Sequence, residues 1–482
     1  MRDITSNLIL ISGHIKAAMQ QLDKGINGVL LCVDERGTMQ GILTDGDIRR
    51  GLIKDIDLND SVESVMNRNF VSGKIENTHE ENLNLLDSVI RHLPILDSKN
   101  RPVDIVSWSE LWRLPVTTPS LAGNELKYVA DCIETVWISS QGSYIEKFQD
   151  AFGLYHGSGM ALCTSSGTAA LHLALVALGV GPGDEVIIPN ITFGATANVV
   201  IHAGAKPIFV DIDPKTLTMD VDALRNAITP RSRAIMPVHL YGHPCDMDPI
   251  LDVAQQHDLK VVEDCAEALG AKYKDHKVGL LGDIGCFSFF ANKVITTGEG
   301  GMVLTKDHNL FERVSLYRDH GMSKENRYWH LVPGHNYRMT NLQAAVGLAQ
   351  LEQIDRFLQQ RQQIVSCYNT HLKSIPGIQI PYSAVWAKNI HWLYFIIIDP
   401  SILGITRDEL GLKLSEKGIE TRPVFYPLHN QPAYEQQISS AAYPVSERFS
   451  KHGLCLPTGN TLSIADTKRV CDELITIIKT SN

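Results

Sequence analysis

The chain has 482 residues, which is too long for one average domain and predicts two or three folding units. Hydrophobic residues make up 44% and charged residues 20%, so the composition excludes disordered, collagen-like and coiled-coil proteins. Lys and Arg total 44 against 54 Asp and Glu, and the net charge of −10 argues against nucleic acid or an anionic membrane as the main partner.

The cysteines and the apolar runs indicate the cellular compartment. The nine cysteines are scattered without a CxxC pair, as expected of reduced thiols. The first residues include Asp3 and only a short apolar stretch, Leu8–Ile11, which does not resemble a signal peptide. No apolar run approaches the roughly 20 residues of a membrane span. We therefore expect a cytoplasmic protein without a membrane partner.

An internal repeat occupies the N-terminal region. At an offset of 63 residues, Asp34 falls on Asp97 and Thr44 falls on Ser107. Each copy has two apolar strands around a polar turn, followed by a helix that Thr44 or Ser107 would cap. One copy is too small to be comfortably stable alone, so we expect the two copies to pack as one paired domain over residues 1–114.

The pattern changes after a Pro-containing linker at residues 115–120. Residues 121–350 alternate strands and helices, which predicts an α/β domain with a largely parallel sheet and helices on both faces. Its β-rich runs are Glu185–Pro189, Pro207–Val210, Ala234–Val238, Lys260–Glu263, Cys286–Phe289 and Met302–Leu304. Residues 351–482 begin with a long polar helix and predict a smaller C-terminal α+β domain. Ligands are expected beyond the carboxyl ends of the parallel strands.

Three segments of the α/β domain carry candidate chemistry. A helix starts within Ala161–Leu175 directly after a strand, and its free N–H groups can bind phosphate, although many such starts are simple caps. Asp264 ends an apolar strand, where a carboxylate can pair with a protonated ring nitrogen, bind a metal or cap the next helix. Lys293 stands between a buried strand and a Gly-rich turn, and a lysine whose pKa is lowered by burial can form a Schiff base.

Together the three segments match the needs of pyridoxal phosphate (PLP). This cofactor requires a lysine for its aldehyde, a carboxylate for its pyridinium nitrogen and an anchor for its phosphate. Asp264 lies about a hundred residues after the helix start, and Lys293 follows 29 positions later. The combination is far more specific than any single segment.

With these residues, the sequence resembles the DegT-type sugar-nucleotide aminotransferases, PLP enzymes of fold type I. The resemblance covers residues 117–482 without large gaps. It rests on Gly123–Tyr128, Trp137–Ser140, Ser166–Leu171, Gly181–Val186, His239–His243, Glu263–Asp264 and Asn336–Asn341. It implies that Lys293 is the Schiff-base lysine and moves the proton between cofactor and substrate carbons. It also implies that Asp264 holds the pyridinium.

The same resemblance assigns the other cofactor contacts. They are Gly167, Thr168 and Ser288 at the phosphate, Phe193 stacked on the ring, Glu267 near the ring hydroxyl, and Asn336 reaching the phosphate of a neighbouring subunit. A shared site of this kind implies a homodimer or a larger assembly. A dehydratase branch of the family carries histidine in place of the lysine, so Lys293 favours amino transfer.

The N-terminal pair resembles cystathionine β-synthase (CBS) domains through the run Gly41–Arg50. In such pairs, Thr44 and Asp47 would hold the ribose of an adenine nucleotide. The second copy carries Ser107 and Glu110 in these places, which leaves open whether it keeps a nucleotide site. The alternative is that the pair serves only dimerisation or packing.

Two further groups of residues have ligand chemistry. His239, His243 and Cys245 do not match a common zinc spacing and are interpreted as structural, without a metal. Arg422 and His429 lie in a segment that could close over a nucleotide sugar. They are candidate substrate contacts, since Arg suits a diphosphate but is more often a surface residue.

The sequence therefore predicts a PLP-dependent aminotransferase. The amino group of glutamate would move onto the 4-keto carbon of a nucleotide-linked 6-deoxysugar, in the synthesis of a surface polysaccharide such as O-antigen. GDP-4-keto-6-deoxymannose is the favoured acceptor by resemblance, and a UDP-linked acetamido ketosugar is the alternative. A hypothesis from another functional class is a nucleotide-sensing or regulatory protein, in which the CBS domains control a catalytically silent aminotransferase fold. The intact set of Lys293, Asp264, Ser288 and Asn336 argues against that hypothesis.

Overall fold

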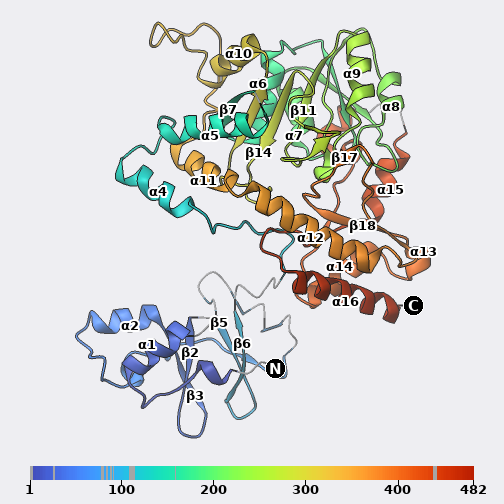
Figure 1. The fold of residues 1–482 in the computed structure, drawn as a ribbon. Helices are drawn as coiled ribbons and strands as arrows, with labels where there is room; N and C mark the ends of the chain where they lie inside the picture. Colours follow the sequence, from blue (N-terminus) through green and yellow to red (C-terminus); the bar gives the residue numbers. More distant parts are fainter. Residues whose placement is uncertain are drawn as a thin grey trace. The chain divides into compact units, whose positions relative to one another are not determined.

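The chain divides into two compact units, Met1–Arg113 and Leu114–Asn482, which are described separately (Figure 1). The computed structural model describes residues 4–24, 28–77, 81–82, 85–86, 90, 92–107, 114–157, 159–437 and 442–481. Among the helices in these ranges, none combines the length and the apolar character that crossing a membrane requires.

The N-terminal unit contains two three-stranded sheets, ordered β1-β2-β3 and β4-β5-β6. In each sheet the first pair of strands is parallel and the second pair is antiparallel. The elements are β1 (Leu8–Leu10), α1 (Ile15–Lys24), β2 (Val29–Val33), β3 (Met39–Thr44), α2 (Asp45–Leu52), β4 (Gly73–Lys74), β5 (His92–Leu96) and β6 (Pro102–Ser107).

The register of these sheets repeats at the offset of 63 residues. Each residue pair of β2 and β3 has its counterpart in β5 and β6, displaced by that number. In both hairpin turns a carboxylate oxygen accepts two backbone N–H groups at 2.9 Å, at Asp34 in the first copy and at Asp97 in the second. The sequence predictions for Glu110, and for the side chain of Ser107, fall outside the described residues.

The two copies bury apolar side chains in a shared cluster. Its buried members are Ile4, Val29, Leu31, Met39, Leu96 and Ile105, drawn from both sheets. The backbone N–H of Met39 also donates to the carbonyl of Asn100 at 3.0 Å, joining a strand of the first copy to the turn of the second. Each copy also has a buried cluster of its own, around Ile15 and Leu30 in the first and around Leu93 in the second, so the shared cluster joins two packed halves into one unit.

The C-terminal unit is built on a seven-stranded sheet in the order β7-β15-β14-β11-β10-β8-β9. Its strands are β7 (Met160–Thr164), β8 (Glu185–Pro189), β9 (Lys206–Val210), β10 (Ser232–Ile235), β11 (Lys260–Asp264), β14 (Ile284–Ser288) and β15 (Gly301–Thr305). Along the sheet, the pairs β9–β8, β8–β10, β10–β11 and β11–β14 are parallel. β15 is antiparallel to both of its neighbours, β14 and β7. Residues 289–300 form no helix, so this connection lacks the element that usually links parallel strands, and β15 returns antiparallel to β14.

Helices cover both faces of this sheet, as the alternating pattern predicts (Figure 1). Ile188 and Val262 pack against α6 and α7, whereas their strand neighbours Ile187 and Val261 pack on the opposite face with α9. The helices are α5 (Ser143–Tyr155), α6 (Gly167–Ala177), α7 (Ala195–His202), α8 (Val221–Asn226), α9 (Met247–Gln256), α10 (His308–Arg318) and α11 (Asn341–Leu351). The largely parallel, two-sided α/β sheet is therefore confirmed.

A second, four-stranded antiparallel sheet forms the C-terminal part, in the order β16-β18-β20-β19. Its strands are β16 (Ile378–Gln379), β18 (Tyr394–Ile398), β19 (Arg422–Pro423) and β20 (Gly453–Leu456), and its helices are α12 (Ile354–Leu372), α13 (Pro400–Leu403), α14 (Arg407–Glu416), α15 (Pro444–His452) and α16 (Ile464–Ser481). Besides short 3-10 helices, the C-terminal unit also contains α4 (Glu125–Glu134) and the short strands β12 (Lys272–Tyr273), β13 (His276–Lys277) and β17 (Ala387–Lys388).

Composition suggests residues 115–120 as a linker, but this segment packs against the C-terminal unit. Leu114 pairs with Ile419 in a parallel bridge. Val116 is fully buried, and its N–H donates to the carboxylate of Glu420 at 2.9 Å. The segment thus starts the C-terminal unit.

Candidate active site

Two neighbouring strands of the large sheet, β11 and β14, end at a pocket of about 440 Å³. β11 ends at Asp264, β14 ends at Ser288, and α6 begins just after β7. These ends meet because strands that run in one direction finish at the same edge of a sheet. The sequence-predicted residues that line the pocket are Gly167, Thr168, Phe193, Asp264, Glu267, Ser288, Lys293 and Arg422.

Asp264 presents a buried carboxylate to the pocket, with only 4% of the residue exposed. Thr196 Oγ1 donates to one carboxylate oxygen at 2.9 Å, and the N–H of Ala266 donates to the other at 3.1 Å. Burial raises the pKa of the Asp264 carboxyl above its usual value, and these hydrogen bonds oppose the rise. Within the described ranges, no cationic side chain forms an ion pair with Asp264, so a protonated ring nitrogen would supply the missing positive charge.

Lys293 reaches the same pocket from the turn between β14 and β15. Its Nζ lies 4.0 Å from Glu267 Oε1 and 3.8 Å from the centre of the Trp392 ring. Burial lowers the pKa of the Lys293 ammonium, and the charges of Glu267 and Asp264 oppose that change. A lowered pKa increases the share of neutral amine, which is the form that attacks a carbonyl.

Glu267 is the acidic neighbour of the lysine. Its Oε2 accepts the backbone N–H of Tyr241 at 2.8 Å, which fixes the carboxyl group. Burial raises the pKa of Glu267 to about 7. The side chain can therefore hold or release a proton near neutral pH beside Lys293.

The start of α6 and Ser288 form an anion cradle. Ser166 caps the helix by accepting the N–H of Ala169 at 3.0 Å, while the first helical N–H groups, at Gly167 and Thr168, have no acceptor within the helix. A Cβ at Gly167 would lie 2.7 Å from the Cβ of Ser288, so the glycine lets that hydroxyl approach the helix start. Backbone donors, the helix dipole and a hydroxyl together suit a phosphate.

Two predicted residues lie at the edge of the pocket. Phe193 is 63% exposed, and its ring centre is 6.2 Å from that of Phe425. Arg422 donates from Nε and Nη2 to Glu420 Oε1 at 3.1 and 2.9 Å, and 44% of its side chain is exposed. The Arg422 guanidinium is thus held at the rim, where it can meet an anionic group of a ligand.

Two predicted residues are not among those that line the pocket. Asn336 is exposed, and its side-chain Oδ1 accepts from Arg338 Nε at 3.3 Å. His429 has both ring nitrogens in use, since Nδ1 accepts from Asn190 at 2.8 Å and Nε2 lies 3.3 Å from a Glu447 carboxylate oxygen. The structure therefore does not bring His429 to the pocket.

In the N-terminal unit, Thr44 and Asp47 form a capping box at the start of α2. Asp47 Oδ2 accepts the N–H and the hydroxyl of Thr44 at 2.9 and 2.6 Å, and Oδ1 pairs with Arg50 at 2.5 Å. Capping accounts for the Thr and the acid three residues later by local structure alone. A ribose would have to compete for, or share, these oxygens.

Among the pocket residues that the sequence interpretation missed, Thr196, Tyr241 and Trp392 contact the predicted site groups directly or through the lysine segment. Thr196 gives no signal because one threonine near a helix start is common. Tyr241 lies within the His239–His243 run, but its φ of +50° and its contact with Glu267 depend on the fold. Trp392 begins the apolar run Trp392–Ile398, which the sequence pattern indicates as a strand and does not link to the pocket.

A buried cluster of His239, Glu263 and Cys265 has the chemistry of metal ligands. Its donors and acceptors are already used. Glu263 accepts from His239 at 3.1 Å and from three backbone N–H groups at 2.7 to 2.8 Å, and the N–H of Cys245 donates to His239 Nδ1. Burial also raises the pKa of the Cys265 thiol to about 12, which keeps it protonated. We therefore interpret the cluster as structural.

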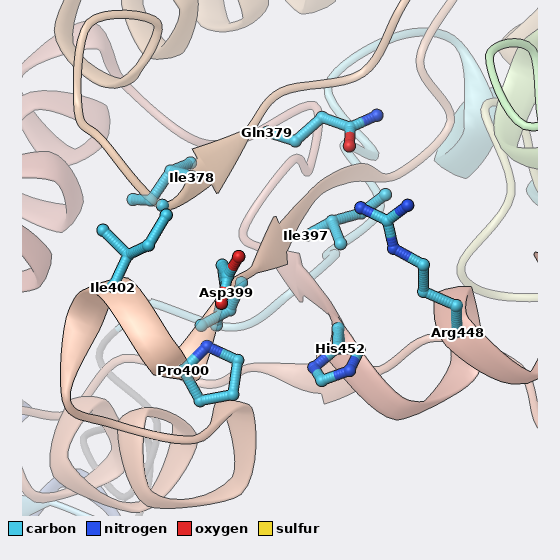
Figure 2. Close-up of a pocket in the computed structure, with 10 residues that line it drawn as sticks. Ile378, Gln379, Ile397, Asp399, Pro400, Ile402, Arg448 and His452 are labelled. Atoms are coloured by element: carbon cyan, nitrogen blue, oxygen red, sulfur yellow. The ribbon is translucent and has the colours of Figure 1, made fainter.

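A separate hollow of about 300 Å³ lies on the C-terminal sheet, between β16, the end of β18, and α15 (Figure 2). Ile378, Ile397 and Ile402 form its apolar side, and Arg448 and His452 approach from α15. None of the sequence-predicted site residues lines it.

The main pocket fits PLP on the chain's own geometry. The uncompensated Asp264 carboxylate suits a pyridinium nitrogen, the cradle of Gly167 and Ser288 suits a phosphate, and the buried Lys293 amine suits an aldehyde. A two-sided sheet that gathers these groups at its carboxyl edge defines a PLP-dependent enzyme of fold type I.

The chain belongs to the DegT/DnrJ/EryC1/StrS aminotransferase family, which matches residues 119–475, and the CBS domain family matches residues 1–54. The sequence-based recognition of both families is thereby confirmed. The chain is a PLP-dependent sugar aminotransferase with an N-terminal CBS domain.

Individual relatives agree with this assignment. GDP-perosamine synthase of Caulobacter vibrioides is 48% identical over 363 residues, covering 75% of this chain and 97% of the relative. The protein of the same name from Escherichia coli O157:H7 is 44% identical over 361 residues, with the same shares. Among solved structures, DesV of S. venezuelae has 34% identity and a TM-score of 0.70, covering 74% of this chain and 94% of DesV. Helicobacter pylori PseC, described as an aminotransferase in pseudoaminic acid biosynthesis, has 27% identity, a TM-score of 0.72, and covers 76% and 99%.

Proposed function

We propose that the protein transfers the amino group of glutamate onto the 4-keto carbon of GDP-4-keto-6-deoxymannose. The product would be GDP-perosamine, used for a surface polysaccharide such as O-antigen, and the reaction would take place in the cytoplasm. The observation that carries the proposal is the meeting of Lys293, Asp264 and Ser288 in one pocket of a chain 48% identical to a GDP-perosamine synthase. A UDP-linked acetamido ketosugar is the competing acceptor.

The proposed roles follow from the positions of the side chains. PLP, when bound, serves as an electron sink for the carbon that loses a proton. Lys293 Nζ holds the cofactor and then moves the proton, and the Glu267 carboxyl 4.0 Å away keeps that amine in place. Asp264 keeps the ring nitrogen protonated. Gly167, Thr168 and Ser288 bind the phosphate, and Phe193 covers the ring.

Room for a nucleotide adjoins this pocket. A second hollow, of about 520 Å³, shares Thr192, Phe193, Pro423 and Phe425 with the main pocket and extends to Tyr426. Arg422 lines the main pocket beside the shared wall, where its guanidinium can meet a diphosphate. This arrangement supports a nucleotide-linked sugar as substrate.

Exposed apolar side chains support a homodimer. Leu126, Ile133, Val136 and Trp137, on and just after α4, are each more than half exposed, and a stable monomer rarely leaves such a surface uncovered. Asn336 is exposed and lies outside the pocket of its own chain, as a residue donated to a partner's phosphate would.

Complementation between subunits tests this arrangement. Lys293→Ala and Asn336→Ala proteins should each have little activity. If they are unfolded and refolded together, each mixed dimer regains one intact site. Random pairing then restores about a quarter of the wild-type activity. A mixture without recovered activity would show that Asn336 serves its own subunit.

We further propose that the first CBS copy binds an adenine nucleotide through Thr44 and Asp47. Both side chains lie together at the start of α2, whose dipole favours anions. Calorimetric titration with AMP should give saturable binding that Asp47→Ala abolishes. Heat equal to that of dilution would leave the pair as a packing module.

The amino donor is tested with isotope. Purified protein, PLP and GDP-4-keto-6-deoxymannose are incubated with ¹⁵N-glutamate or ¹⁵N-alanine. Mass spectrometry should find ¹⁵N in a GDP-linked amino sugar with glutamate and much less with alanine. Equal labelling from both donors would contradict a glutamate preference. An absence of any amino sugar would contradict the proposed acceptor.

A further inference from the structure

Trp392 contacts the lysine segment in two independent ways. The face of its ring lies 3.8 Å from Lys293 Nζ, which is a cation–π contact. Its indole N–H donates to the carbonyl of Asn292, the residue before the lysine, at 2.8 Å. One side chain thus holds both the amine and the backbone that carries it. Trp392 is 3% exposed, so both contacts are shielded from water.

Trp392 is also linked through Tyr241 to Glu267, the acidic neighbour of Lys293. The backbone N–H of Trp392 donates to the carbonyl of Tyr241 at 2.9 Å, and the two rings stack with 6.1 Å between centres and 15° between planes. The N–H of Tyr241 in turn holds Glu267, whose other oxygen lies 4.0 Å from Lys293 Nζ. The amine therefore rests between an indole face and a carboxyl group that are fixed to each other.

The backbone behind Trp392 is held in an unusual conformation. His391 has φ of +47° and Tyr241 has φ of +50°, values that side-chain-bearing residues rarely adopt. Such conformations cost free energy and persist where the surroundings impose them, often at functional sites. Here two such residues meet at the segment that presents one indole.

A buried arginine also holds the backbone of Trp392. Arg361 of α12 is 1% exposed and donates to the carbonyl of Trp392 at 2.7 Å. Within the described part of the chain it forms no ion pair, and its Nε has no hydrogen-bond partner. Burying an arginine against carbonyl groups alone is costly, so the position of the Trp392 backbone is maintained at the expense of stability.

We propose that Trp392 is a positioning residue for Lys293, holding the amine at a fixed resting place whenever it is not bound to the cofactor. The inference rests on the proposed function of Lys293. In that function the lysine is attached in one part of the reaction and free in the other. A free lysine has four rotatable side-chain bonds, and an indole face beside a carboxyl group limits where its amine goes. The amine then returns to the same position for each proton transfer.

The test measures the amine in the protein without cofactor. Acetylation of Lys293 by acetic anhydride is followed by mass spectrometry at a series of pH values, and the rate profile gives the pKa of the amine. Trp392→Leu removes the aromatic face and Trp392→Phe removes only the N–H and part of the face. Trp386→Phe is the matched control, because Trp386 packs against Tyr273 and His243 and contacts neither Lys293 nor Asn292.

The expected result is a graded fall in the pKa of Lys293. Loss of a desolvated cation–π contact should lower the pKa by about half a unit to one and a half units in Trp392→Leu, and by less in Trp392→Phe. The other charged groups that line the pocket, Asp264, Glu267, Glu299 and Arg422, are the same in all variants. Trp386→Phe should leave the profile unchanged.

Two results would overturn the proposal. One is a Lys293 profile in Trp392→Leu that matches wild type, and the other is a rise in pKa, which would mean that the indole only excludes water. Circular dichroism identifies a variant that fails to fold, in which case Trp392→Phe against Trp386→Phe decides. The readout needs no substrate. A failure of the proposed sugar specificity would therefore leave this result intact.

Discussion

Glu267 Oε1 and Lys293 Nζ face each other at 4.0 Å inside the pocket, and both side chains are nearly removed from water. Burial moves their two pKa values toward each other, raising that of Glu267 to about 7 and lowering that of Lys293. The preference for a proton on the lysine rather than on the carboxyl is therefore smaller than it would be in water. A site that must move one proton between two carbon atoms benefits from this balance.

Replacing Glu267 by Gln should change how stability depends on pH. The raised pKa means that the folded protein binds more protons than the unfolded chain between pH 4.5 and about 7, so this group's contribution to stability is lost as the pH rises through that window. Glu267→Gln removes the effect. Relative to wild type, the free energy of unfolding of the variant should increase by up to about 3 kcal/mol from pH 5 to pH 7.5. Urea titrations of the cofactor-free proteins measure it, and a constant difference would contradict the assignment.

Lys293→Ala should abolish covalent binding of PLP and lower turnover by at least roughly a thousandfold. Borohydride reduction followed by peptide mass spectrometry should place the cofactor on Lys293 in wild type and nowhere in the variant. Lys306→Ala, at an exposed lysine of the same unit, serves as the control and should behave as wild type. Retained turnover in Lys293→Ala would refute the assigned role.

Asp264→Asn should keep the shape of the pocket but remove the charge that holds the ring nitrogen protonated. We expect turnover to fall by roughly a hundredfold or more, as for other buried electrostatic contacts to a reacting group. Thr196→Val leaves the Asp264 charge in place, removes the hydrogen bonds of Thr196 Oγ1 with Asp264 and Thr192, and should cost about tenfold or less. Steady-state rates of both variants give the comparison. Equal losses would mean that the hydrogen bond, not the charge, is decisive.

Gly167→Ala should weaken the binding of PLP. The new Cβ would meet the Cβ of Ser288 at 2.7 Å, so either the helix start or Ser288 must move and the phosphate loses donors. Gly181→Ala is the control, because its nearest neighbour would be 4.0 Å away. Absorbance titration of the cofactor-free proteins should show an affinity reduced at least about tenfold for Gly167→Ala only. Unchanged affinity would place the phosphate elsewhere.

The large sheet could be predicted well from the sequence because each strand is a short apolar run followed by turn residues. Glu185–Pro189 is a strand at those residues, and Lys260–Glu263 falls one residue short of β11. β15 is antiparallel to β14 and follows a connection, residues 289–300, that contains no helix. The rhythm of strands and helices alone does not distinguish this antiparallel strand from a parallel one.

The chemistry of the site was predictable where a residue of suitable type stands at a strand end, as Asp264 does, or in the turn that follows a strand, as Lys293 does. It was not predictable for Trp392, because its contact with Asn292 joins residues 100 positions apart and depends on packing between two sheets. His429 is the opposite case, because the sequence suggests it as a substrate contact but the fold does not bring it to the pocket. Its residue type suits a ligand, but Asn190 and Glu447 occupy both ring nitrogens once the chain folds.

The measurement that tests the central claim most directly is a competition between acceptors. Purified protein, PLP and glutamate are mixed with equal amounts of GDP-4-keto-6-deoxymannose and a UDP-linked 4-keto acetamidosugar, and the products are resolved by mass. The proposed function predicts a GDP-linked amino sugar as the main product. A UDP-linked amino sugar alone would contradict the proposed acceptor, and no amino sugar from either, with PLP demonstrably bound, would contradict amino transfer to both ketosugars.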